Sequence, residues 1–138
     1  MLNRKASLVV ATTTVMAVSA CGSTTRYAND PRPPDLAIIT TAVTNDRVAV
    51  APARVGAGPV EFTLANETGA SQTVTVASDQ AGQLRLQTPP INPGDTASLK
   101  TVLKTGGYSV RVDGSTIRAS RIAVGPSRPS AQSTLLEP

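Results

Sequence analysis

Apolar and polar residues alternate along the middle of the chain. Val60, Phe62 and Leu64 are separated by single intervening residues, which would place all three on one face of a strand. This alternation predicts a strand at 59–65, which is the clearest case. Similar short segments predict further strands at 36–43, 47–51, 72–76, 83–87, 96–103, 108–112 and 117–124. No stretch has the period of an amphipathic helix with its caps. The pattern therefore predicts an all-β chain of seven or eight short strands.

Turn residues separate these segments. Residues 66–69 (Asn-Glu-Thr-Gly) and 92–95 (Asn-Pro-Gly-Asp) have the composition of turns. Asp113-Gly114 lies between two apolar segments, which predicts a tight hairpin there. Short strands with frequent turns favour a single Greek-key β-sandwich, which we expect over residues 35–125.

Proline-rich polar segments flank this expected domain. Residues 21–34 include Pro31, Pro33 and Pro34 among Ser, Thr, Asn and Asp, and residues 126–138 begin with a second such stretch. Segments of this composition bury too little apolar surface to become ordered. We therefore expect a flexible tether at 21–34 and a disordered tail at 126–138.

The first twenty residues have the layout of a signal peptide. Arg4 and Lys5 give a short positive region, and an apolar stretch follows from residue 8 to residue 17. This stretch is shorter than the ~20 residues that a membrane-spanning helix needs. Residues 1–20 are therefore predicted to be a signal peptide.

The end of this segment, Val18-Ser19-Ala20-Cys21, resembles the lipobox of bacterial lipoproteins. Small residues at 19 and 20 would let a signal peptidase reach the bond before Cys21, whose thiol would accept a diacylglyceryl group. An N-acyl chain such as palmitate would follow, and two lipid signals give stable anchoring. The resemblance implies a cell-membrane lipoprotein on the extracytoplasmic side. The alternative is an ordinary secretory signal with an incidental cysteine.

The stretch from Gly58 to Gly125 resembles the cupredoxin fold. Three segments carry the resemblance: a strand that ends in the turn Asn66-Glu67-Thr68-Gly69, the Pro93-Gly94 turn before a later strand, and the strand that begins Gly106-Gly107-Tyr108. The resemblance implies a cupredoxin-like sandwich. An immunoglobulin-like sandwich is the competing interpretation, because it has the same alternating strands and turns.

Copper-binding cupredoxins use two His, a Cys and usually a Met. The positions that resemble the first His and the Cys are Gln72 and Val112, and the loop beyond Val112 is expected to be shortened to a tight hairpin. The chain has no His, its Cys is Cys21, and Met1 and Met16 lie in the predicted signal peptide. We therefore expect no copper and no other metal site. A resemblance of fold alone does not imply that this chain shares the copper-binding function.

Charge and composition argue against other functions. The precursor carries 13 basic and 9 acidic side chains, and without Arg4 and Lys5 the net charge falls to +2. The remaining basic residues are dispersed, Arg111, Arg118 and Arg121 form no obvious patch, and aromatic residues make up only 2% of the chain. Nucleic-acid binding is therefore not expected.

Catalytic chemistry is not expected either. Without His, a Ser-His-Asp triad is impossible. The nearest carboxylate pair is Glu61 and Glu67, with Glu61 on the polar face of its strand, and Lys100 and Lys104 are expected to be solvated. The chain is therefore predicted to be no enzyme and to need no cofactor apart from the lipid at Cys21.

These observations favour a non-catalytic binding or accessory module of the cell envelope. Its partner would be an envelope protein or a cell-wall polymer, and the loop Thr68-Gly69-Ala70-Ser71 is the candidate contact surface. Two alternatives stay open. One is a solute-binding carrier for a transporter, for which Phe62 and Tyr108 would supply the aromatic lining. The other is a structural lipoprotein without a specific ligand.

Overall fold

The computed structural model describes residues 32–130, and within them the chain is all-β. These described residues contain eight strands and no helix: β1 (Ala37–Val43), β2 (Val48–Ala51), β3 (Arg54–Asn66), β4 (Val74–Ser78), β5 (Arg85–Gln87), β6 (Thr96–Leu103), β7 (Gly106–Val112) and β8 (Ser120–Ser127). The predicted all-β class is thereby confirmed. Predicted signal peptide and lipobox residues lie outside the described part of the chain.

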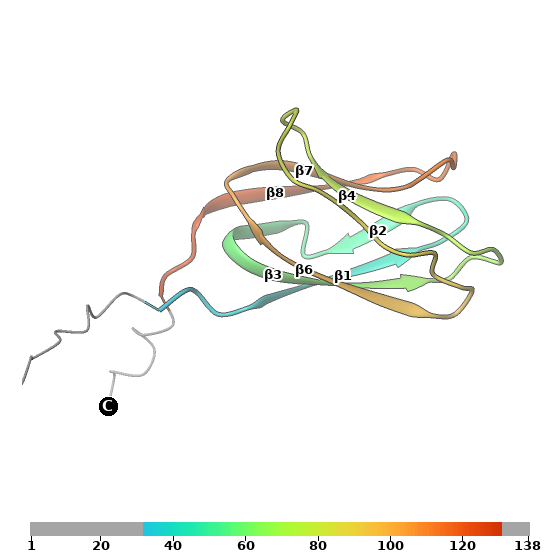
Figure 1. Cartoon of the computed structure of the whole chain (residues 1–138), viewed down its shortest axis with the longest axis horizontal. Helices are drawn as coiled ribbons and strands as arrows, with labels where there is room; N and C mark the ends of the chain where they lie inside the picture. Colours follow the sequence, from blue (N-terminus) through green and yellow to red (C-terminus); the bar gives the residue numbers. More distant parts are fainter. Residues whose placement is uncertain (1–31, 131–138) are drawn as a thin grey trace, which may run out of the picture.

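The strands form two layers that face each other (Figure 1). In the first layer β3 lies between β1, which runs parallel to it, and β6, which runs antiparallel, while β2 pairs with the outer edge of β1. In the second layer the order is β8-β7-β4-β5, all antiparallel. The fold is therefore a β-sandwich, as the alternation predicts.

Strand β3 belongs to both layers. Its first residues, Arg54 to Ala57, pair with β8 in the second layer, and the residues from Gly58 onward pair with β6 in the first. The change of layer coincides with an irregularity between Gly56 and Ala57 and with a positive φ of 139° at Gly58, which an L side chain rarely adopts. The sequence predicts this strand only from residue 59, because the two glycines interrupt the alternation.

The core lies between the inward faces of the layers. Phe62 and Leu64 from β3 are fully buried together with Val76 of β4 and Val110 of β7. These positions have the parity that the alternating pattern predicts. Tyr108 is also buried, and its hydroxyl donates a hydrogen bond to the Lys104 carbonyl at 3.0 Å. The aromatic side chains proposed for a solute site, Phe62 and Tyr108, thus pack in this core.

The connection between β7 and β8 differs from the prediction. A tight hairpin at Asp113-Gly114 is wrong, because the chain runs through residues 113–119 before β8 begins at Ser120. Arg118 pairs with the start of β2 instead: its N–H donates to the Asp46 carbonyl at 3.2 Å, and its carbonyl accepts from Val48 N–H at 2.8 Å. This pairing with a distant segment holds the loop open.

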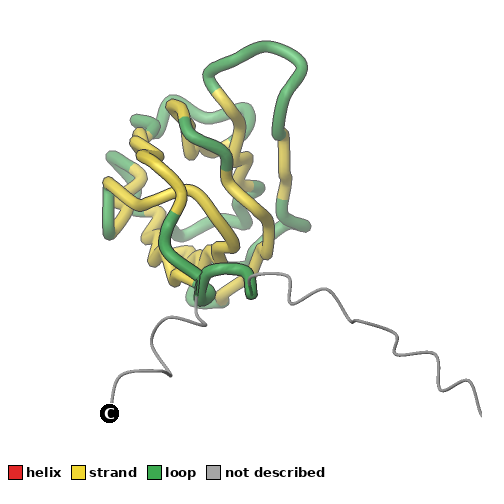
Figure 2. Tube along the Cα trace, turned by 90° about the vertical axis from the view of Figure 1, so that its left-hand side faces the viewer, coloured by secondary structure: helices red, strands yellow, loops and turns green. Residues whose placement is uncertain are grey.

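Both ends of the described chain lie side by side at one end of the sandwich, which Figure 2 views directly. The Ser130 hydroxyl donates a hydrogen bond to the Arg32 carbonyl at 2.5 Å. We call this the terminal end; it also includes residues 57–59 and 102–105. The opposite, distal end consists of the loops 44–47, 67–73, 92–95 and 113–119. Residues 32–35 and 128–130 thus close one end of the domain.

The start of the predicted tail is corrected by these contacts. The sequence predicts disorder from residue 126, yet β8 continues through Ser127 and Arg128 packs against β3. The Arg128 guanidinium donates to the Asp35 carbonyl at 2.7 Å and to the Pro59 carbonyl. Residues 131–138 lie outside the described part of the chain.

Candidate functional site

The candidate contact loop lies at the distal end and is fixed by Asn66. The Asn66 side chain is 1% exposed, and its amide donates to the carbonyls of Ala70 and Ile91, each at 2.8 Å. Its side-chain oxygen accepts hydrogen bonds from the Thr68 N–H at 3.0 Å and the Thr68 hydroxyl at 2.7 Å. A buried amide with every bond satisfied gives the loop one conformation.

Within this loop the four predicted residues have different positions. Thr68 is 5% exposed, so its side chain supports the loop from inside and is not available for contact. Gly69, Ala70 and Ser71 are exposed. The loop therefore presents three small residues on a rigid frame. Asn66 is the residue that the sequence interpretation missed; the Asn-x-Thr spacing at a strand end, typical of an Asx turn, was the available signal.

Positions that resemble copper ligands also lie at the distal end. Val112 pairs with Val74 and is buried, and Gln72 lies two residues before Val74. The Gln72 amide donates to the Thr68 hydroxyl at 3.2 Å. The alkyl side chain of Val112 cannot bind copper, and the amide of Gln72 is already hydrogen-bonded to Thr68. These two residues therefore do not fit the metal.

Asp and Glu side chains, which could bind a metal ion, do not cluster in the described part of the chain. Among residues 32–130, no group of three or more His, Cys, Asp or Glu is placed to hold a metal ion. The same residues form no helix long and apolar enough to cross a membrane.

The comparisons with known proteins concern the fold. No protein family model matches the sequence, and no curated protein is similar to it at a significant level. Similar solved structures include the reduced Cu(I) form of a P52G mutant of amicyanin, with 16% identity and a TM-score of 0.44 over 63% of this chain and 81% of amicyanin. Another is the blue copper oxidase from Nitrosomonas europaea, with 14% identity and a TM-score of 0.47 over 75% of this chain and 43% of that protein.

Both of these proteins contain cupredoxin-like domains, the fold that the sequence resembles. This likeness adds nothing to the sandwich, which the strand pairing of this chain shows by itself. The copper chemistry in their names belongs to those proteins.

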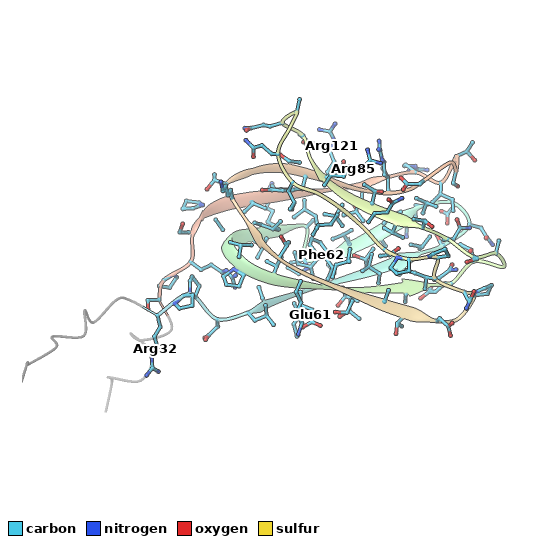
Figure 3. The ribbon with its side chains drawn as sticks, viewed as in Figure 1. Arg32, Glu61, Phe62, Arg85 and Arg121 are labelled. Carbon is cyan, nitrogen blue, oxygen red and sulfur yellow. The ribbon has the colours of Figure 1, made fainter. Side chains whose placement is uncertain are left out.

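Arginine side chains gather on the outer face of the second layer. Ser109 pairs with Arg121, so that Arg111, two residues further along β7, lies on the same face as Arg121. The third arginine considered in the sequence, Arg118, lies outside these two strands. Arg121 pairs with Asp79 at 3.8 Å and Arg111 with Asp113 at 3.7 Å, while Arg118 lies in the distal loop 113–119. Figure 3 shows Arg85 and Arg121 on the side opposite Glu61.

Outer-face residues of the first layer include an ion pair rather than a catalytic pair. Glu61 accepts a hydrogen bond from the Ser98 hydroxyl at 2.6 Å and lies 3.5 Å from the Lys100 ammonium. The Ser98 bond, and then the charge of Lys100, lower the pKa of Glu61. Glu67 lies six residues further along the chain, at the distal end, about 20 Å away at the rise of a strand. The two carboxylates are not brought together.

A cavity lies at the terminal end between the ends of the described chain, the segment 57–59 of β3, and the end of β6 with the turn that follows it. Its volume is about 630 Å³, and its lining residues come from four segments: Arg32, Pro33, Pro34, Ala57, Gly58, Pro59, Val102, Leu103, Lys104, Thr105, Ser127, Arg128 and Ser130. Arg128 lies across Gly56 and Gly58, where any Cβ would collide with its side chain. The glycines thus make room for the arginine that joins the chain ends to β3.

Proposed function

We propose that this chain is a membrane-anchored lipoprotein that acts as a non-catalytic binding module of the cell envelope. Cys21 would carry a diacylglyceryl group and an N-acyl chain, and the sandwich would lie on the extracytoplasmic side of the membrane. The partner would be an envelope protein or a cell-wall polymer.

The proposal rests on the arrangement of the sandwich, whose chain ends lie at one end and whose exposed contact loop lies at the other. Arg32, the first described residue, lies at the terminal end beside Ser130. Ten residues separate Cys21 from Arg32, so that a fully extended tether reaches at most about 40 Å. An anchor at Cys21 would hold the terminal end towards the membrane. The distal end, where Asn66 fixes the exposed residues Gly69, Ala70 and Ser71, would face away from it and meet a partner.

The anchor is tested in bacterial cells that express the full precursor. We expect a clickable palmitate analogue to label the protein, and the label and membrane fractionation to be lost together in Cys21→Ser. An unlabelled protein that is released from the membrane with Cys21 intact would refute the anchor.

The partner is tested with a photo-cross-linking residue at Ser71. The matched control is Thr63, which is exposed on the side of the first layer. A single stoichiometric adduct from position 71 and none from position 63 would support a binding module. Equal or absent adducts from both positions would refute the distal loop as the contact surface. The solute-carrier alternative is less favoured, because Phe62 is fully buried in the core and Tyr108, which borders a second cavity beside Leu84 and Lys104, is only 2% exposed.

A further inference from the structure

Large apolar side chains remain exposed near the terminal end. Leu36 is 47% exposed, Ile38 61% and Val102 64%, and these are the large hydrophobic residues that stay exposed among residues 32–130. Ile38 pairs with Glu61 across one side of β3, and Val102 pairs with Pro59 across the other. Residues two apart in a strand share a face, so Ile38 and Val102 lie on the same outer face of the first layer. An exposed patch of this kind is typical of an interaction surface.

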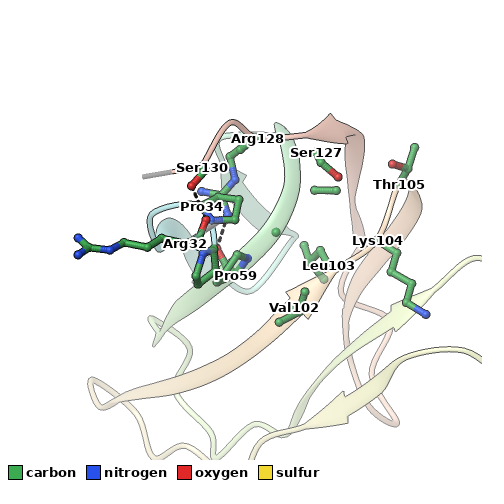
Figure 4. A pocket seen from close by; sticks show the side chains of 13 residues that line it. Arg32, Pro34, Pro59, Val102, Leu103, Lys104, Thr105, Ser127, Arg128 and Ser130 are labelled. Atoms are coloured by element: carbon green, nitrogen blue, oxygen red, sulfur yellow. Dashed lines mark hydrogen bonds between the residues drawn. The ribbon is translucent and has the colours of Figure 1, made fainter. Parts of the chain in front are cut away.

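The patch continues into the terminal cavity. Val102 and Pro59 belong to both, and Pro33, Pro34 and Leu103 extend the apolar lining. Figure 4 shows Pro59, Val102 and Leu103 in the middle of this surface. We call the combined surface, Leu36, Ile38, Pro59, Val102 and the cavity lining, the terminal patch.

Cationic side chains border the terminal patch. Arg32 and Lys104 extend from opposite sides of the cavity (Figure 4), and Lys100 lies on β6 in the same row as Ile38 and Glu61. Arg128 contributes a fourth cation in the lining. Two carboxylates, Asp35 and Glu61, lie in the same region, and Glu61 is paired with Lys100. The border therefore keeps a net positive charge.

We propose that the terminal patch rests on the surface of an anionic phospholipid bilayer. The apolar side chains would enter the interface between headgroups and acyl chains, and Arg32, Lys100 and Lys104 would lie among anionic headgroups. This inference rests on the proposed anchor, which would hold the patch within one tether length of the membrane. At such an effective concentration a weak contact is occupied most of the time.

The experiment replaces the lipid by an artificial anchor, so that it does not depend on lipidation. The chain from residue 21 onward carries Cys21→Ser and an N-terminal histidine tag, which binds a nickel-chelating lipid in vesicles. Because the sequence contains no histidine and no other cysteine, the tag is the only such anchor and an introduced cysteine is the only thiol. An environment-sensitive fluorophore is attached at Val102→Cys or, as the matched control, at Thr63→Cys further along the same face.

We expect vesicles of phosphatidylcholine with phosphatidylglycerol to shift the emission of the probe at position 102 to the blue, with little shift at 63. Lys104→Glu combined with Arg32→Glu should reduce the shift several-fold, and added salt should do the same. Equal emission at the two positions would overturn the proposal. So would a shift at position 102 that is just as large in vesicles without phosphatidylglycerol and is unaffected by the charge reversal.

A second copy of the chain is the competing occupant of the terminal patch. Concentration-dependent dimerisation in solution that is lost in Val102→Asp would assign the patch to self-association and overturn the bilayer contact. A failed palmitate label with a positive vesicle result would refute the anchor and leave the lipid-facing surface. A positive palmitate label with a negative vesicle result would support the anchor and refute the contact of the terminal patch with the bilayer.

Discussion

The two ends of the sandwich are closed in different ways. At the distal end a buried, uncharged side chain, Asn66, joins the loop that contains Thr68 and Ala70 to the segment at Ile91. At the terminal end Arg128, from beyond the last strand, reaches back to the carbonyls of Asp35 and Pro59. One end depends on a residue within a strand, and the other on a residue that the sequence assigns to the disordered tail 126–138. The folded domain therefore extends into the segment that the sequence assigns to the tail.

The largest effect is expected at the distal end. Asn66→Ala removes the partner of the buried Thr68 N–H and of the Ala70 and Ile91 carbonyls, and should lower the free energy of unfolding by about 3 kcal/mol. Urea denaturation measures this loss. Asn45→Ala, at an exposed turn position of the same end, is the matched control and should cost less than about 0.5 kcal/mol. Similar values for both variants would contradict the role of Asn66.

A smaller loss is expected at the terminal end. Arg128→Met keeps an unbranched side chain over Gly56 but removes the bonds to Asp35 and Pro59, and should cost about 2 kcal/mol. Amide hydrogen exchange should become faster at the start of β1 and in the middle of β3, with the distal loops unchanged. Arg121→Met, whose ion pair is exposed, should cost under about 1 kcal/mol. If amide hydrogen exchange were unchanged in Arg128→Met, the contacts of Arg128 with Asp35 and Pro59 would not contribute to the stability of the domain.

The smallest effect concerns pH. A hydrogen bond from Ser98 lowers the pKa of Glu61 below 4.5, and a hydrogen bond from Thr44 lowers that of Asp46 below 3.8. Carboxyl groups with lowered pKa values stabilise the fold above their unfolded pKa, and this stabilisation is lost as the pH falls through the folded pKa. We expect Tm to fall below about pH 4. The fall should be slightly smaller in Glu61→Gln, and an equal fall would contradict the Ser98 contact.

Local pattern determined much of this fold. The predicted segment 96–103 matches β6 residue for residue, and the parity of Val60, Phe62 and Leu64 is the observed one. The features that the sequence did not predict depend on contacts between segments that are distant along the chain. The first part of β3 lies where two glycines remove the alternation, and the loop 113–119 is held by pairing with residues near 46–48. No period along a chain reveals partners at that separation.

The candidate site was predicted in outline only. Residues 69–71 are exposed at a sandwich end, as a contact loop requires, but Thr68 is turned inward by the Asn66 network. The terminal patch was not foreseen, because Leu36, Ile38 and Val102 belong to apolar stretches that favour burial in any reading of single strands. Their exposure depends on which face of the first layer remains uncovered, and only the pairing of β1, β3 and β6 decides this.

The parallel pairing of β1 with β3 has a mechanical consequence. Seven residue pairs, from Ala37–Val60 to Val43–Asn66, run from the terminal end to the distal end. A module held by its N-terminus and pulled at its distal loops would be loaded along these strands. Their hydrogen bonds lie across that direction and would share the load in shear, instead of opening one after another. Such a domain could transmit tension between a membrane and a wall without unravelling from its anchored end.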